Sequence, residues 1–208
     1  LQRADLTPDD FEGREGCFDV LVRTRPDVVA GVHEAYFRAG CDVVETDSFG
    51  GSRIVLAEYG LAAETYDLAR RAAALAREVA HGCSTAARPR FVCGSVGPGT
   101  RLPSLGMITF RELRDGFRPQ IEGLLDGGAD LLILETCQDP LQIKAALDAA
   151  REAFRAGRTR VPVLVSLTVE ASGTLLVGTD LPAALAILDP LGVEGIGLNC
   201  AAGPEGLE

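Results

Sequence analysis

Tryptophan is absent from the 208 residues, and aromatic residues together make up only 5% of the chain. No apolar run is long enough to cross a bilayer, and no signal peptide is recognisable at the amino end. Basic residues number 20 against 30 acidic ones, and the net charge of −10 is repelled by phosphate backbones and anionic lipid surfaces. These features argue against membrane and nucleic-acid binding, and we expect a cytoplasmic protein.

Closely paired cysteines and catalytic histidines are also lacking. The six cysteines are widely spaced, which excludes a zinc ribbon and a disulfide scaffold and predicts free thiols. We interpret the two histidines, His33 and His81, as structural residues of helices, so a Ser-His-Asp triad is not expected. No lysine follows a predicted strand, which disfavours Schiff-base lyases and aldolases.

Strand and helix patterns alternate along the chain. Five strands with continuous Val, Ile and Leu cores are predicted at residues 41–49, 90–95, 129–136, 161–169 and 193–200. Such apolar strands are typical of a parallel sheet covered by helices. The pattern fits either a (β/α)8 barrel or a doubly wound sheet. The glycine-rich stretch 94–99 lacks the spacing of a dinucleotide-binding turn.

Helix boundaries are marked by capping residues. Pro26 is a favoured first-turn residue and Gly40 a favoured terminator. Thr109 and Glu112 form a capping-box pattern, and Asp139 precedes a proline at a helix start. Helices are therefore predicted at residues 26–40, 62–79 (ended by Gly82), 109–125, 139–154 and 180–188, after an irregular segment 1–25 with one helical turn near Leu21.

The predicted strands end in polar residues. In both architectures ligands bind at the carboxyl ends of the strands. The ends carry carboxylates, hydroxyls, an amide and thiols but no basic residue, which favours a ligand with an ammonium group or a metal over a phosphate. A carboxylate on the ligand would need backbone N–H donors from the glycine-rich loops. The candidate residues are Glu45, Thr46, Asp47, Ser48, Ser95, Glu135, Thr136, Thr168, Glu170, Asn199 and Cys200.

The cysteines differ in their predicted settings. Cys200 is presented at the mouth of the last strand, although one cysteine does not make a metal site. Cys41 and Cys93 are interpreted as core residues, and Cys17 and Cys83 as incidental loop residues. Cys137, two residues after Glu135, stays open between a structural and a functional role.

The strand-end motifs resemble those of homocysteine S-methyltransferases, and the resemblance covers essentially the whole chain. Four segments carry it in family order, at residues 45–50, 94–98, 134–139 and 197–200. Two more, residues 102–106 and 168–179, are similar to the homocysteine-binding module of the cobalamin-dependent methionine synthases. Asp47 and Ser48 stand where family members more often carry Asn and Thr.

The resemblance implies a (β/α)8 TIM barrel with one zinc ion held by three cysteines at its mouth. Cys200 matches the first zinc ligand, while the Cys-Cys pair that supplies the other two has no match in the chain. Glu135 matches the acid that holds the homocysteine ammonium group, and we expect Thr46, Ser95 and Asn199 to bind substrate beside it. Residues 1–208 are expected to form a single barrel domain truncated at both ends, with about five of the eight strands and no activity alone.

The implied reaction is methylation of homocysteine to methionine. Zinc would hold the substrate as a thiolate, and methylcobalamin would supply the methyl group and be restored by 5-methyltetrahydrofolate, both on other modules of a longer chain. One alternative is a cobalamin-independent relative that uses betaine or S-methylmethionine. Another is a non-catalytic fragment that lacks the complete zinc site.

Overall fold

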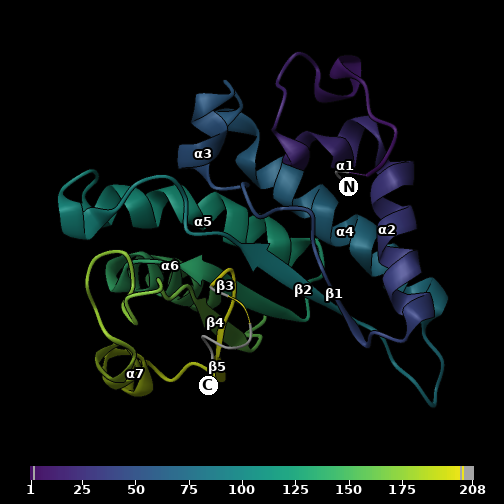
Figure 1. The fold of residues 1–208 in the computed structure, drawn as a ribbon. Coiled ribbons are helices and arrows are strands. Elements are labelled where there is room, and N and C mark those ends of the chain that lie inside the picture. Colours follow the sequence, from purple (N-terminus) through teal and green to yellow (C-terminus); the bar gives the residue numbers. More distant parts are fainter. Residues whose placement is uncertain (2, 202, 204–208) are drawn as a thin grey trace.

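A computed structural model describes residues 1, 3–201 and 203, and its centre is one five-stranded parallel sheet. The strands pair in sequence order, β1-β2-β3-β4-β5 (Figure 1). A doubly wound sheet reverses its strand order at a switch point, whereas a (β/α)8 barrel does not. The prediction of a barrel-type α/β fold is therefore confirmed, with the strands at β1 (Val43–Glu45), β2 (Phe91–Val96), β3 (Leu131–Cys137), β4 (Val163–Leu167) and β5 (Gly195–Leu198).

Helices follow the strands and cover one face of the sheet (Figure 1). The three longest, α4, α5 and α6, pack side by side in chain order, and α4 and α5 contact β2 while α6 contacts β3. No helix in the described part of the chain is long and apolar enough to cross a membrane. The helices are α1 (Leu21–Thr24), α2 (Pro26–Ala39), α3 (Arg53–Glu58), α4 (Thr65–Cys83), α5 (Phe110–Asp126), α6 (Pro140–Arg155) and α7 (Leu181–Leu188).

The two faces of the sheet differ in burial. Val44 and Val92 are buried in a cluster with Ala76 of α4. Val43 and Phe91, which point the other way and are register partners, remain 42% and 40% exposed. We call this second side of the sheet the open face. Of the strand-end carboxylates on this face, Glu45 is exposed and Glu135 is half-buried, whereas Cys93 and Ser95 are buried.

The structure corrects several predicted boundaries. The strand predicted at 41–49 is only Val43–Glu45, because beyond Glu45 the Thr46 and Ser48 side chains bind β2. Helix α4 begins at Thr65 after a 3-10 turn and continues through Gly82 to Cys83. Helix α3 was not predicted, although Ser52, whose hydroxyl accepts a hydrogen bond from the Val55 N–H, is a normal N-cap.

The helix caps predicted at Gly40, Thr109 and Asp139 are confirmed. Thr109 and Glu112 form the reciprocal capping box of α5, and Gly40 ends α2 with φ 111°. Asp139 caps α6 by accepting from the Leu141 N–H at 2.8 Å. The same carboxylate accepts from the Ser104 N–H and hydroxyl, both at 2.8 Å, so it also anchors the loop after β2.

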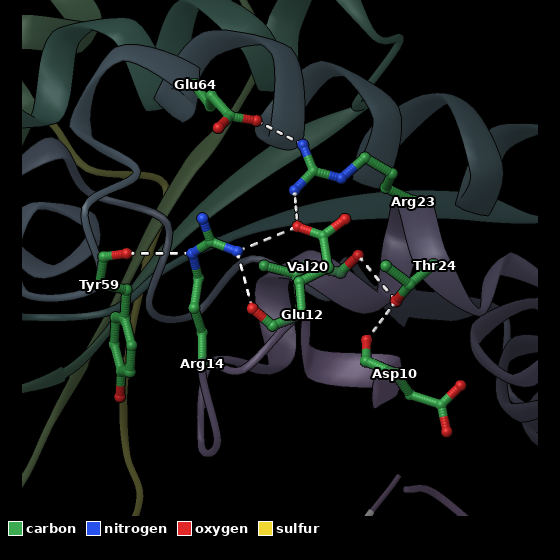
Figure 2. Close-up of polar contacts among 8 residues, drawn as sticks. All are labelled: Asp10, Glu12, Arg14, Val20, Arg23, Thr24, Tyr59 and Glu64. Atoms are coloured by element: carbon green, nitrogen blue, oxygen red, sulfur yellow. Dashed lines mark hydrogen bonds and ion pairs between the residues drawn. The ribbon is translucent and has the colours of Figure 1, made fainter. Parts of the chain in front are cut away.

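An ion-pair network holds the amino-terminal segment against the turn between α3 and α4 (Figure 2). Arg23 bridges Glu12, at 2.6 Å, and Glu64. Arg14 pairs with Glu12 at 3.1 Å and donates to the Tyr59 carbonyl at 3.1 Å. The helical turn expected near Leu21 is confirmed as α1.

The same segment corrects the interpretation of Cys17 as incidental. Its thiol is buried with Val20 and Leu56, and burial raises the pKa of Cys17 to about 11. Cys41, predicted to be a core residue, is only half-buried, whereas Cys93 is buried as predicted. Cys83, predicted in a loop, ends α4.

Two glycines bring α4 and α5 into close contact. A Cβ on Gly123 would lie 2.4 Å from the Tyr66 carbonyl oxygen, and one on Gly127 would lie 2.4 Å from the Arg70 carbonyl oxygen. Atoms cannot approach so closely, and backbone cannot yield as a flexible side chain does. Both positions therefore require glycine for packing.

The aspartates Asp19 and Asp47 line the same pocket, and neither forms an ion pair with a basic side chain in the part of the chain that the structure describes. Asp19 is 8% exposed, and neither its Oδ1 nor Oδ2 of Asp47 has a hydrogen-bond partner in the described residues. Burial raises the pKa of Asp19 to about 7. Burial and the Asp19 charge raise the pKa of Asp47 to about 8.

The glycine contact gives a first prediction. Gly123→Ala should destabilise the fold by about 1–3 kcal/mol, because the added methyl overlaps α4. Gly31→Ala, at an exposed position in α2 with nothing within 4 Å, should stabilise it by about 0.5–1 kcal/mol. Urea denaturation measures both changes, and equal effects of the two substitutions would contradict this view of the α4–α5 contact.

The aspartate pair gives a second prediction. Because the folded pKa of Asp47 is raised, the unfolded chain loses its proton first, and stability falls as pH rises between about 4 and 8. Asp47→Asn should therefore stabilise the protein by about 1–3 kcal/mol at pH 8, with the gain shrinking toward pH 4. Denaturation across this range is the measurement, with the exposed Asp5→Asn as control. A gain independent of pH would contradict the assignment.

Candidate active site at the carboxyl ends of the strands

The exits of β1 and β2 are joined by buried hydrogen bonds around Ser95. Its N–H donates to Thr46 Oγ1 at 3.0 Å, and its carbonyl accepts from the Ser48 hydroxyl at 2.8 Å. The two hydroxyls of Thr46 and Ser48 share a hydrogen bond of 2.6 Å. Gln120 of α5 donates to the Ser48 carbonyl at 2.6 Å. The main chain of Ser95 is thus held on both sides.

Glu135 at the end of β3 accepts a hydrogen bond from this fixed residue. The Ser95 hydroxyl donates to Glu135 Oε1 at 2.5 Å, and the Thr136 hydroxyl lies 3.4 Å from Oε2. Glu135 is half-buried and forms no ion pair within the described residues. A carboxylate that is oriented by a hydroxyl but lacks a cation is suited to receive a cationic ligand.

Asn199 joins the exits of β3, β4 and β5. Its Oδ1 accepts from the Thr136 N–H at 3.1 Å and from the Ser166 hydroxyl at 2.8 Å. Its Nδ2 donates to Thr136 Oγ1 at 2.8 Å and lies 3.6 Å from the Cys200 sulfur. The Asn199 amide therefore fixes the position of Thr136 relative to the thiol of Cys200.

Two residues in contact with the Asn199 side chain, Thr136 and Cys200, have a strained backbone. Thr136 has φ 57° and Cys200 has φ 52°, in the left-handed region that a β-branched residue such as threonine rarely adopts. Such strain persists only where surrounding bonds impose it, and it clusters at functional sites. Here the hydrogen bonds of Asn199 impose it on Thr136.

Cys200 is the exposed cysteine of this strand-end cluster. Its sulfur lies 3.9 Å from the Thr136 hydroxyl, so two side-chain donors point at it. Cys93 and Cys137 are buried, and burial together with nearby glutamates raises the pKa of both thiols far above the ordinary value. The sequence did not decide between a structural and a functional role for Cys137, and its burial and raised pKa favour a neutral core residue.

The described residues supply part of a metal site. Within residues 1, 3–201 and 203, no group of three or more His, Cys, Asp or Glu side chains is placed to hold a metal ion. Cys200 nevertheless fits zinc, because it is a soft, accessible donor whose thiolate would be stabilised by hydrogen bonds from Asn199 and Thr136.

The structure brings most of the predicted residues together, and it adds others. Thr46 and Ser95 belong to the network at β1 and β2, and Glu135, Asn199 and Cys200 to the cluster at β3 and β5. Ser166 and Gln120 were missed. Gln120 carries a signal in the sequence, because it interrupts an apolar helix face formed by Leu113, Phe117 and Leu124.

Known proteins are similar to this chain in sequence. A family model described as homocysteine S-methyltransferase matches residues 1–208. Methionine synthase of Mycobacterium leprae (strain TN) is 49% identical over 204 residues, and that of Mycobacterium tuberculosis (strain ATCC 25618 / H37Rv) is 50% identical over 205. Each match covers 98% of this chain and 17% of the relative, so the chain spans less than a fifth of these proteins.

Solved structures agree with the sequence relatives. The metallated form of the homocysteine methyltransferase MmuM from Escherichia coli matches with a TM-score of 0.76 at 26% identity, over 98% of this chain and 77% of that one. Its apo form matches with a TM-score of 0.70 at 25% identity, over 98% and 75% of the two chains. The chain belongs to the homocysteine S-methyltransferase family.

Proposed function

We propose that this chain is the homocysteine-binding part of a methionine synthase. The observation that carries the proposal is the cluster in which Asn199 connects Cys200 to Thr136, next to the cation-free carboxylate Glu135. A thiol donor for a metal and an acceptor for an ammonium group thus lie at one end of the sheet. The ligand that fits both carries a thiol and an ammonium group, as an amino-acid thiol does, whereas other small thiols and amines carry only one of the two.

Glu135 accepts the α-ammonium group of homocysteine in this proposal. Ser95 positions that carboxylate through its 2.5 Å hydrogen bond. Thr46 is 5% exposed and uses its hydroxyl to hold Ser95, so it acts mainly as a positioning residue. Asn199 acts similarly on Cys200, and a direct substrate contact from either Thr46 or Asn199 stays a prediction.

Cys200 supplies one zinc ligand. Zinc, when bound, lowers the pKa of the substrate thiol and keeps it in the nucleophilic thiolate form. Further thiolate ligands would come from outside the described residues, in keeping with residues 1–208 being one piece of a barrel domain within a longer cytoplasmic protein. The chain's own contribution is to hold the Cys200 sulfur near Asn199 and near Thr136, the residue that follows Glu135.

Methylcobalamin is the proposed methyl donor, with 5-methyltetrahydrofolate restoring it on other parts of the protein. The identity of 49% and 50% to methionine synthases, against 26% to MmuM, favours this donor over S-methylmethionine or betaine. The test is methylation of homocysteine by the complete protein with each donor in turn. Turnover with S-methylmethionine alone would replace the proposed donor, and no turnover with any donor would favour the non-catalytic alternative.

Cys200→Ser tests the metal assignment. The variant of the complete protein should lose most of its bound zinc, because a hydroxyl is a far weaker zinc donor than a thiolate. Elemental analysis of purified protein measures this, and half-buried Cys41→Ser should keep the wild-type content. Unchanged zinc in the Cys200 variant would remove this residue from the site.

Glu135→Gln tests the ammonium site. Loss of a charge-assisted hydrogen bond should raise the KM for homocysteine by about 10- to 100-fold. Ser95→Ala, which leaves the charge in place but frees the carboxylate to move, should give a smaller increase. Steady-state kinetics of the complete protein measures both, and a Glu135 variant with an unchanged KM would contradict the assigned role.

A further inference from the structure

Ser166 lies on β4, next to the strand that delivers Cys200. It is 7% exposed and is the register partner of Gly197 on β5. Side chains two residues apart on an extended chain share a face, so Asn199 follows Gly197 on the side of Ser166. A Cβ placed on Gly197 would meet only Ser166 Oγ, at 4.0 Å, in the described part of the chain. The glycine therefore leaves room for the Asn199 side chain to reach back to Ser166.

Three consecutive residues at the end of β4 hold Asn199 in place. The Ser166 hydroxyl donates to Asn199 Oδ1 at 2.8 Å. The Leu167 carbonyl accepts from the Asn199 N–H at 3.0 Å, and the Thr168 hydroxyl donates to the Asn199 carbonyl at 3.1 Å. Both the backbone and the side chain of the residue before Cys200 are thus fixed from one neighbouring strand.

The orientation of the Asn199 amide follows from its partners. Oδ1 faces the Thr136 N–H at 3.1 Å, and a backbone N–H can only donate, so the oxygen must lie at this end of the amide. Nδ2 therefore faces Thr136 Oγ1 at 2.8 Å and Cys200 Sγ at 3.6 Å. One of the two amide N–H groups is left for the sulfur.

Ser166 is the polar residue of a strand otherwise made of Val and Leu. A buried hydroxyl needs a hydrogen-bond partner, and among the described residues the side-chain partner of Ser166 is Asn199. Without this hydroxyl, Oδ1 would keep only the Thr136 N–H, and the amide could turn its own N–H away from the sulfur. Donors around a metal-binding side chain orient it and raise its affinity for the metal.

We propose that Ser166 is a positioning residue for the zinc ligand Cys200, because it holds the Asn199 amide with one N–H directed at the sulfur. This inference rests on the proposed function, in which Cys200 binds zinc. Ser166 acts through Asn199, and the strand that carries neither the ligand nor its neighbour thereby contributes to metal affinity.

The test measures how firmly the complete zinc-loaded protein holds its metal. Transfer of zinc to a chromogenic chelator should be roughly 3- to 10-fold faster in Ser166→Ala, as expected for the loss of one hydrogen bond. Ser166→Thr, which keeps a hydroxyl, should restore the wild-type rate. Asn199→Asp places a carboxylate oxygen where the amide nitrogen faces the sulfur, and it should accelerate the transfer about 10- to 100-fold.

Ser84→Ala is the matched control. The Ser84 hydroxyl donates to the Ala80 carbonyl at 2.9 Å and accepts from the Arg90 N–H at 2.9 Å, near the amino end of β2. Its removal should lower stability in urea denaturation and leave the rate of zinc transfer unchanged. Faster transfer in this variant would show that any loss of stability releases zinc, and would overturn the inference.

The remaining outcomes separate this inference from the proposed function. A wild-type transfer rate in Ser166→Ala, while Cys200→Ser loses its zinc, overturns the role of Ser166 alone. Equally fast transfer in Ser166→Thr and Ser166→Ala also overturns it, because the hydroxyl would then not be the group that matters. Full zinc retention in Cys200→Ser contradicts the metal assignment in the proposed function itself.

Discussion

The hydrogen bonds to the main chain of Ser95 are the interaction on which the geometry of the site depends. Parallel strands end together at one edge of a sheet, where their last backbone groups lose their regular partners. Here Thr46 and Ser48 take over the N–H and carbonyl of Ser95, and Gln120 reaches in from α5 to the Ser48 carbonyl. Because these bonds hold Ser95 in place, its hydroxyl can orient the Glu135 carboxylate. The hydrogen bonds that satisfy the backbone groups at the strand ends thus also position the side chains of the site.

The acidic side chains at the strand ends differ from those on the outer surface in having no basic partner within the described residues. Arginines are plentiful on the outer surface, where Arg23, Arg77 and Arg158 each pair with acids. The carboxylates at the strand ends have no such partner within the described residues. Carboxylates without a basic partner repel one another, and a cationic ligand of the kind proposed above would reduce that repulsion.

Much of this arrangement could be predicted from the sequence. The apolar runs predicted all five strands, and the caps at Thr109 and Asp139 predicted the starts of α5 and α6, because these signals are local. The burial of Cys17 could not be predicted, since it depends on Leu56 and Val20 packing over a segment without periodicity. The left-handed conformations of Thr136 and Cys200 also escaped prediction, because hydrogen bonds to Asn199, 63 residues further along the chain from Thr136, impose the first of them.

The order of the strands also bears on how the chain reaches its structure. Neighbouring strands of the sheet are consecutive in the chain, and the three long helices α4, α5 and α6 pack side by side in the same order. A growing polypeptide can therefore add one strand and one helix at a time to an edge that already exists, as it leaves the ribosome. Strand β5 follows β2 and β3 in the chain, so the thiol of Cys200 joins the cluster only after Ser95 and Glu135 have been made.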